Sequence, residues 1–148
     1  MVWDSRMESG IPVIDHEHKQ LVNQVAALLD EPNQERVREM FDFLREYVIK
    51  HFAHEQLMHK SIEYPGAAEH KQAHKDFVET FLQLEEEYRD NGYNSELLEK
   101  IVGVVSNWLR DHIMGMDMAF AQFYRTLSPD DRPSETSYPS RPTEWRYR

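Results

Sequence analysis

The chain has 148 residues, of which 40% are hydrophobic and 30% charged, a size and balance typical of one globular domain with a continuous core. Its net charge of −10 argues against a nucleic-acid partner, since an acidic surface repels a phosphate backbone, and no apolar run approaches the ~18 residues that span a membrane. Cysteine is absent and the first residues lack the pattern of a secretory signal, so we expect a cytoplasmic protein without disulfides or thiolate metal sites.

The first half of the chain predicts two amphipathic helices. Residues 15–30 carry apolar side chains and one histidine at spacings of three and four, the period of a helix that buries one face. Glu31-Pro32-Asn33 ends this helix, and Asn33 or the acidic turn after it can begin the next one. The second helix is expected to reach about Lys60, and Tyr64-Pro65-Gly66 then forms a turn.

The second half of the chain repeats this organisation. A third helix is expected from the turn to about Asp90, with Gly92 as its C-terminal stop. Ser95 is the expected cap of a fourth helix that runs to about Leu127. Because no segment alternates like a strand, residues 1–127 predict an all-α, up-down-up-down four-helix bundle with an N-terminal arm, in which Trp3 packs across the bundle end.

Residues 128–148 are expected to form a C-terminal extension outside the bundle. They contain four prolines and no helical period, which is typical of a disordered end. Tyr138, Trp145 and Tyr147 are unusual in such an end. The alternative is therefore that this tail packs on the bundle or binds a partner protein.

The helical stripes place polar residues where a bundle core needs leucine. A buried imidazole or carboxylate without partners costs several kcal/mol, so this many must satisfy a common requirement. Spacings of four put each pair on the second and third helices on one face, aimed at one point on the bundle axis. The residues are His18, His51, Glu55, His70, His74 and His112.

Asp117 is the seventh candidate, and its spacing is irregular. It follows His112 by five residues, which on a regular α-helix would turn it well off the shared face. We expect a local π-bulge near Gly115, a carboxylate that reaches sideways to bridge two metals, or both. The alternative is that Asp117 is a surface residue and Met116 alone faces inward.

These residues fall within four motifs that resemble the bacterial hemerythrins. The resemblance covers about Trp3 to Tyr124 and matches all seven positions in type and order; Gln56 departs from it, since the family usually has glutamate there. The motifs are Ile14-Asp15-x-x-His18-Lys19-x-Leu21, His51-Phe52-x-x-Glu55-x-x-Met58, Tyr64-Pro65-x-x-x-x-His70-x-x-x-His74-x-x-Phe77 and Trp108-Leu109-x-x-His112-Ile113-x-x-x-Asp117.

The resemblance implies a division of labour among the seven residues. His70, His74 and His112 would hold one iron, and His18 and His51 the other. Glu55 and Asp117 would bridge the two irons together with an oxo or hydroxo group, and dioxygen would bind at the open position of the iron with two histidines. The family's oxygen pocket corresponds to Phe52, Trp108, Leu109 and Ile113.

The ligand set favours reversible dioxygen binding over turnover. Ferritin-like di-iron enzymes use Glu-x-x-His motifs, and this chain has none. We therefore expect a non-enzymatic protein for oxygen storage, delivery or scavenging. Two alternatives stay open: an oxygen or redox sensor that acts through the tail or a partner, and a weak peroxidase or nitric-oxide-handling protein.

The remaining polar residues near the motifs have less specific roles. His16, His54 and His59 are expected on the surface, although His54 could lie near the site as a hydrogen-bond partner or an acid–base group. Asp15 or Glu17 is expected either to orient a ligand imidazole or to cap the first helix.

Overall fold

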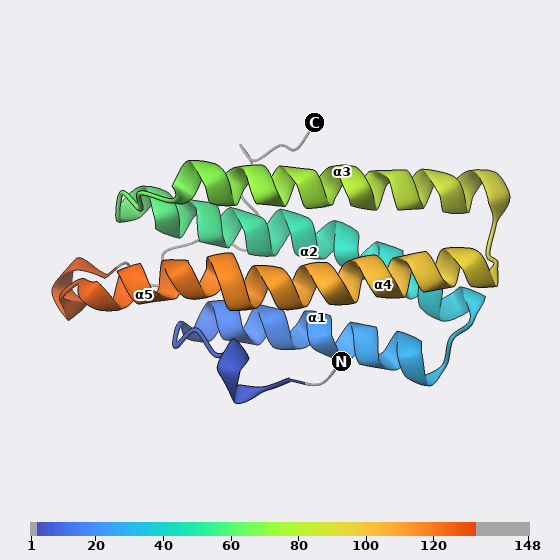
Figure 1. Ribbon diagram of the computed structural model, residues 1–148, viewed down its shortest axis with the longest axis horizontal. Coiled ribbons are helices and arrows are strands. Elements are labelled where there is room, and N and C mark those ends of the chain that lie inside the picture. The colour runs from blue at the N-terminus through green and yellow to red at the C-terminus, as the bar shows by residue number, and fades with distance from the viewer. Residues whose placement is uncertain (1–2, 133–148) are drawn as a thin grey trace.

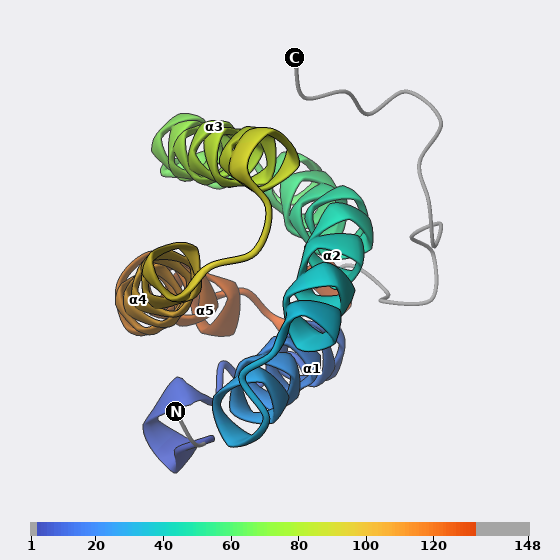
Figure 2. The same ribbon diagram turned by 90° about the vertical axis from the view of Figure 1, so that its right-hand side faces the viewer.

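The computed structural model describes residues 3–132 and forms an antiparallel bundle (Figure 1). Viewed along the helices, α1, α2, α3 and the α4–α5 pair follow one another around a common axis (Figure 2). No strand occurs within the described residues, so the predicted up-down-up-down four-helix bundle is confirmed. The helices are α1 (Pro12–Asp30), α2 (Gln34–Ser61), α3 (Ala67–Asn91), α4 (Ser95–His112) and α5 (Met118–Thr126), and a π-helical segment, Ile113–Asp117, joins α4 to α5.

Polar side chains cap the N-termini of α2 and α4, and a glycine ends α3. Asn33 precedes α2 and its side chain accepts from the Arg36 amide, as an N-cap does. α3 ends at Gly92, whose φ of 72° is the left-handed conformation that glycine adopts without strain. The expected cap at Ser95 is wrong by one residue, because the Asn94 side chain accepts from the Leu97 amide instead.

Two apolar clusters share the core, and the predicted polar residues lie between them. The larger cluster fills the bundle from Leu28 and Leu97 to Phe52 and Ile113. The smaller cluster lies beyond the polar level and consists of Ile11, Ile14, Met58 and Phe120. α1, α2 and the α4–α5 pair thus pass from apolar core through a polar level to a second apolar layer, whereas α3 begins at the polar level.

The N-terminal arm is attached to the bundle by specific contacts. Its 3-10 helix, Ser5–Met7, buries Met7 in the larger cluster, and Trp3 packs against the same cluster with Lys19 Nζ 5.3 Å from its ring centre. Asp15 accepts from the Ser9 amide and hydroxyl, each at 2.8 Å. Asp15 therefore holds the arm at the start of α1 and orients no imidazole.

The described part of the C-terminal extension is short. After α5, Pro129–Asp131 form one 3-10 turn, and the Arg132 guanidinium lies 5.3 Å from the Tyr124 ring centre. The predicted roles of Tyr138, Trp145 and Tyr147 fall outside the described residues. Between residues 3 and 132, none of the helices combines the length and apolar character that crossing a membrane requires.

Candidate metal centre

All seven predicted residues are buried at the polar level of the bundle. α1 contributes one of them, α2 and α3 two each, and the end of α4 with the π-helical segment the last two. Their nitrogen and oxygen atoms form two groups, each with all atoms within 4.8 Å of one another: Glu55, His70, His74, His112 and Asp117 form one, and His18, His51, Glu55 and Asp117 the other.

Asp117 reaches this level because the helix changes its winding after His112. On a regular α-helix five residues turn by ~500°, which would direct Asp117 away from His112. The π-helical segment Ile113–Asp117 holds one more residue per turn and returns the carboxylate inward, with Oδ1 3.1 Å from His112 Nε2. The predicted bulge near Gly115 is confirmed, and the alternative of a surface Asp117 is wrong.

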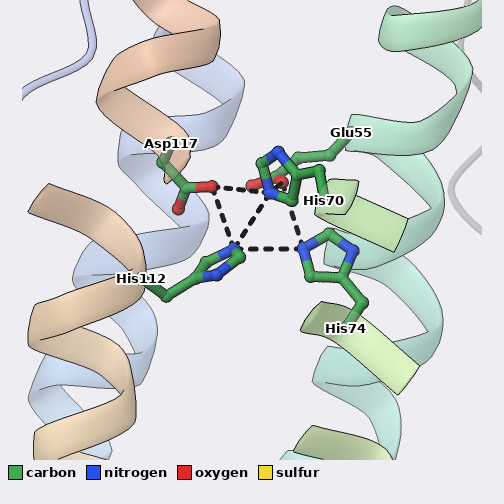
Figure 3. Close-up of side chains that lie close together, drawn as sticks. All are labelled: Glu55, His70, His74, His112 and Asp117. Atoms are coloured by element: carbon green, nitrogen blue, oxygen red, sulfur yellow. Dashed lines mark hydrogen bonds and ion pairs between the residues drawn. The ribbon is translucent and has the colours of Figure 1, made fainter. Parts of the chain in front are cut away.

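Three histidines surround one point of the site (Figure 3). His112 Nε2 lies 3.0 Å from His70 Nε2 and 3.1 Å from His74 Nε2. A neutral imidazole nitrogen either donates or accepts, so three Nε2 atoms this close cannot all satisfy one another. Their convergence instead provides three lone pairs for one shared cation.

Two further histidines form the other half of the site. His18 Nε2 and His51 Nε2 lie 3.1 Å apart. His51 Nε2 is 2.7 Å from Glu55 Oε1, and His18 Nε2 is 2.9 Å from Asp117 Oδ2. This half therefore has the same two carboxylates as the first but one histidine fewer.

Each carboxylate turns one oxygen to each half. Oε2 of Glu55 lies 2.8 Å from His70 Nε2, on the opposite side from its Oε1 contact with His51. Oδ1 of Asp117 likewise lies 3.0 Å from His70 Nε2, whereas Oδ2 faces His18. A nitrogen-rich donor set suits iron, copper or zinc better than calcium or magnesium. The residues can hold a metal, and the divided carboxylates fit a pair of ions.

The charges of the site are balanced internally. Burial alone would lower the pKa of His51 and of His70, but the facing Glu55 raises both pKa values to about 10. Burial alone would raise the pKa of Glu55, yet His51 and His70 hold it well below its usual range. Burial lowers the pKa of His74 to about 3. Without metal, protons therefore occupy some of the ring nitrogens that converge on the carboxylates.

Glu17 supports the half of the site with two histidines. It is buried, and its Oε1 accepts from His51 Nδ1 at 3.2 Å. His54 Nδ1 lies 3.0 Å from the other oxygen, Oε2. Glu17 thus orients a histidine across the helix interface rather than its neighbour His18. The expectation of a surface His54 is wrong, because this shared carboxylate gives the ring a buried partner; the proposed place near the site is confirmed.

His59 is also buried, contrary to the expected surface position, whereas His16 is exposed as predicted. His59 lies on α2 four residues beyond Glu55 and packs between His70 and Phe120. Burial and the nearby His70 lower the pKa of His59 to about 4, so the ring is neutral at pH 7. The spacing of four from Glu55 is a signal in the sequence that could have placed it inside.

Aromatic rings enclose the site. Phe52 stacks on His74 with ring centres 3.8 Å apart, and Trp108 stacks on His112 at 4.3 Å. Leu109 and Ile113 are fully buried beside them. The four residues predicted for an oxygen pocket therefore form an apolar wall beside the three histidines. All four also belong to the larger cluster or pack against it.

Comparisons with known proteins agree with this geometry. Residues 9–124 match the model of the family described as "Hemerythrin HHE cation binding domain". The chain belongs to the hemerythrin family. It is 31% identical to the bacteriohemerythrin of Stenotrophomonas maltophilia over 125 residues, which are 82% of this chain and 79% of that protein. It is also 30% identical to the hemerythrin of Themiste dyscrita over 118 residues, 80% and 88% of the two chains.

The family membership covers the whole bundle. The matched range begins at Ser9, which contacts Asp15, and ends at Tyr124 in α5. It includes every residue of both histidine groups. A myohemerythrin of Theromyzon tessulatum is 30% identical over 118 residues, so the likeness extends to animal as well as bacterial hemerythrins.

Proposed function

We propose that this hemerythrin-family protein binds dioxygen reversibly at a di-iron centre. The observation that carries the proposal is the division of Glu55 and Asp117, each of which turns one oxygen to either group of histidines. Two ferrous ions held by these residues would each supply one of the two electrons that dioxygen takes up on binding. The relatives named hemerythrin and bacteriohemerythrin support iron over the other metals that suit such donors.

The proposed ligands are those of the two groups. His70, His74 and His112 would hold one iron and His18 and His51 the other, with Glu55 and Asp117 shared. The second iron has one histidine fewer, which leaves room there for a small ligand. The ligand side chains are themselves at most 6% exposed, so the room among them suits dioxygen rather than a larger substrate.

The enclosing residues favour binding over turnover. Phe52 is buried and apolar and contacts both halves of the site, with its ring centre 3.8 Å from that of His74 and 5.8 Å from that of His51. Together with the buried Leu109 and Ile113, it offers no proton to a small ligand. Water excluded by such a wall cannot assist loss of the ligand by proton transfer. We therefore propose a carrier, store or scavenger of oxygen rather than an enzyme.

The test is an optical spectrum of the full chain loaded with ferrous iron under argon. A visible band should appear when air is admitted and disappear when oxygen is removed, with two irons per chain by elemental analysis. A band that never forms, or one that forms and cannot be reversed, would contradict reversible binding. His112→Ala should reduce the iron content and abolish the band, whereas His16→Ala, at an exposed position of α1, should change neither.

A further inference from the structure

One face of α2 carries a third polar residue in line with two of the proposed ligands. His51, Glu55 and His59 follow one another at spacings of four, so they share a face of the helix. His51 and Glu55 point into the two histidine groups, but His59 belongs to neither group. Its position one turn further along places it beside the half of the site with three histidines.

His59 is enclosed almost completely. Only 2% of it is exposed to solvent. Its ring centre lies 4.6 Å from that of His70, 4.4 Å from that of Phe120 and 5.0 Å from that of Tyr64. The phenyl ring of Phe120 and the phenol ring of Tyr64 cover it on two sides, and the imidazole of His70 is the neighbouring ring with an unpaired buried nitrogen.

Three ring nitrogens at this contact lack hydrogen-bond partners. They are His59 Nδ1, His59 Nε2 and His70 Nδ1, all buried. A buried donor or acceptor that has lost its water and gained no partner destabilises the folded chain. Two adjacent rings with three unsatisfied nitrogens are therefore poorly explained as packing alone.

The other nitrogen of His70 determines what its Nδ1 must do. His70 Nε2 faces Glu55 at 2.8 Å and Asp117 at 3.0 Å, so Nε2 is the atom directed at the site. When Nε2 binds a metal, the ring proton is on Nδ1; when the ring is protonated, Nδ1 carries a proton as well. His70 Nδ1 is a donor in both states and needs an acceptor.

We propose that His59 is a positioning residue that accepts a hydrogen bond from His70 Nδ1 and so fixes the orientation of this ligand ring. A neutral imidazole has one nitrogen that can accept, and the ring centres of His59 and His70 lie 4.6 Å apart. This is close to the 4.7 Å between the rings of His18 and His51, whose Nε2 atoms are 3.1 Å apart. The remaining N–H of His59 then lies next to Phe120, whose plane is inclined by 68° to its own, as in an N–H contact with a ring face.

This role gives the two halves of the site different supports. On one side the carboxylate of Glu17 accepts from His51 Nδ1, and on the other the neutral ring of His59 would accept from His70 Nδ1. A carboxylate makes the histidine it holds a stronger electron donor than a neutral acceptor does. The inference extends the proposed metal ligation by His70, and it supplies the partner that this ligand otherwise lacks.

The hydrogen bond can be measured directly in the unaltered full chain labelled with ¹⁵N. An N–H···N bond transmits a scalar coupling between its two nitrogens, so a cross-peak should link His70 Nδ1 to a nitrogen of His59. The measurement is made first without metal, where it is independent of metal binding, and then with two equivalents of Zn²⁺. A resolved His70 N–H without this coupling in the metal-free chain would overturn the proposal.

Two substitutions test the positioning role. His59→Phe keeps a ring against Phe120 and Tyr64 but removes the acceptor, and His59→Gln keeps an acceptor without the ring. We expect His59→Phe to release one of two Zn²⁺ ions to a chelator about 10–100-fold faster and His59→Gln to stay near wild type. Equal release from all three proteins, or equal acceleration in both variants, would contradict the role. His16→Phe, on the exposed side of α1, is the matched control.

These outcomes are separate from those of the proposed function. A failure of the wild-type chain to bind oxygen leaves the coupling between His70 and His59 to be judged by itself. Conversely, a chain that binds oxygen reversibly but shows no such coupling keeps the proposed function and loses this inference.

Discussion

At the scale of single residues, the site depends on side chains that hold the ligands as well as on the ligands themselves. Glu17 accepts from His51 at 3.2 Å and from His54 at 3.0 Å, so one buried carboxylate fixes two rings. Burial would raise the pKa of Glu17, but its bonds to His51 and His54 lower it to about 2. Glu17 is therefore ionised over the whole physiological range of pH.

The first prediction concerns this carboxylate. Glu17→Gln keeps the shape and one oxygen acceptor but removes the negative charge that polarises His51. We expect the affinity for the metal of the two-histidine half to fall about 10–100-fold, as is usual when such a partner is lost. Competition with a chelator of known affinity measures the effect.

A matched variant separates this effect from a general loss of negative charge. Glu99→Gln removes one charge from an exposed position of α4 and should leave both metal affinities unchanged. A Glu17→Gln protein that bound metal as tightly as Glu99→Gln would show that the contact with His51 has no influence on the site.

The second prediction follows from the protons of the metal-free site. The pKa values of His51 and His70 are raised to about 10 by Glu55, so both rings are protonated at pH 7 without metal. A metal needs the lone pair of each ring, and its binding must release these protons. The metal-free state binds more protons, so the apparent affinity should rise with pH up to about 10. Proton release on Zn²⁺ addition in weakly buffered solution measures this, and binding without release would contradict it.

Single residues also show where sequence reasoning was sufficient and where it was not. Six of the candidate site residues were predictable because each occupies a core position that is costly without a common partner. The spacing of five left a surface position open for Asp117, and only the resemblance and an expected π-bulge placed it inside. His54 and His59 were assigned to the surface because histidine on a charged helix is usually solvated. The burial of His54 depends on Glu17 across the interface, a contact that the local sequence does not reveal. For His59, the spacing of four from Glu55 was the available signal, although its contact with Phe120 from α5 was not.

At the scale of the elements, the irregular segment between α4 and α5 carries the one candidate ligand that a regular α-helix could not direct inward. The spacing of five between His112 and Asp117 is incompatible with one face of an α-helix, and the chain accommodates it by a π-helical turn. Gly115 lies in this turn, is exposed, and has no atom within 4 Å of the position a Cβ would take. The extra residue therefore projects outward while the carboxylate points inward.

The third prediction tests this register. Inserting one alanine after Gly115 should turn Asp117 by a further ~100° and remove its carboxylate from the site. We expect metal binding to fall below two ions per chain while the helical content stays nearly constant. Elemental analysis and circular dichroism measure the two quantities.

Two companion variants separate the change of register from other effects of altering this turn. Deleting Gly115 leaves a spacing of four, ~400° on a regular α-helix, so Asp117 should stay on the inner face and keep its role. Gly115→Ala should bind metal normally and be stabilised by up to about 1 kcal/mol, because the added methyl group meets open space and alanine favours helix. Normal metal binding by the insertion variant would contradict the register argument.

The bounds of the elements followed largely from local signals in the sequence. Asn33 and Gly92 mark helix ends for the reasons expected of a capping side chain and of a left-handed residue. The cap of α4 was misplaced by one residue because Asn94 and Ser95 are adjacent and both favour that position. Only the backbone conformation, extended at Asn94 with ψ 165°, distinguishes the cap from the first helical residue.

At the scale of the whole molecule, the polar level divides the core into unequal parts. The larger apolar cluster draws residues from all four long helices. The smaller cluster contains Ile11, Ile14, Met58 and Phe120 and lies beyond the buried charges. Its helices are therefore joined to the rest through a layer of buried histidines and carboxylates whose desolvation a metal would offset.

The last prediction is that metal removal loosens one end of the molecule rather than all of it. Without metal, the polar level is held only by the contacts of its histidines with Glu55 and Asp117, so it should open more readily. Opening at this level exposes the smaller cluster but leaves the larger one packed. Amide hydrogen exchange around Ile14, Met58 and Phe120 should therefore accelerate at least about tenfold on chelation, equivalent to ~1.4 kcal/mol, while exchange around Leu28 and Leu97 changes little.

Adding Zn²⁺ should restore the protection. Equal acceleration at both ends would mean that the metal stabilises the fold as a single unit, and no acceleration would mean that the smaller cluster is held by its own packing and by the Arg125 bond to the Ser9 carbonyl at 2.6 Å.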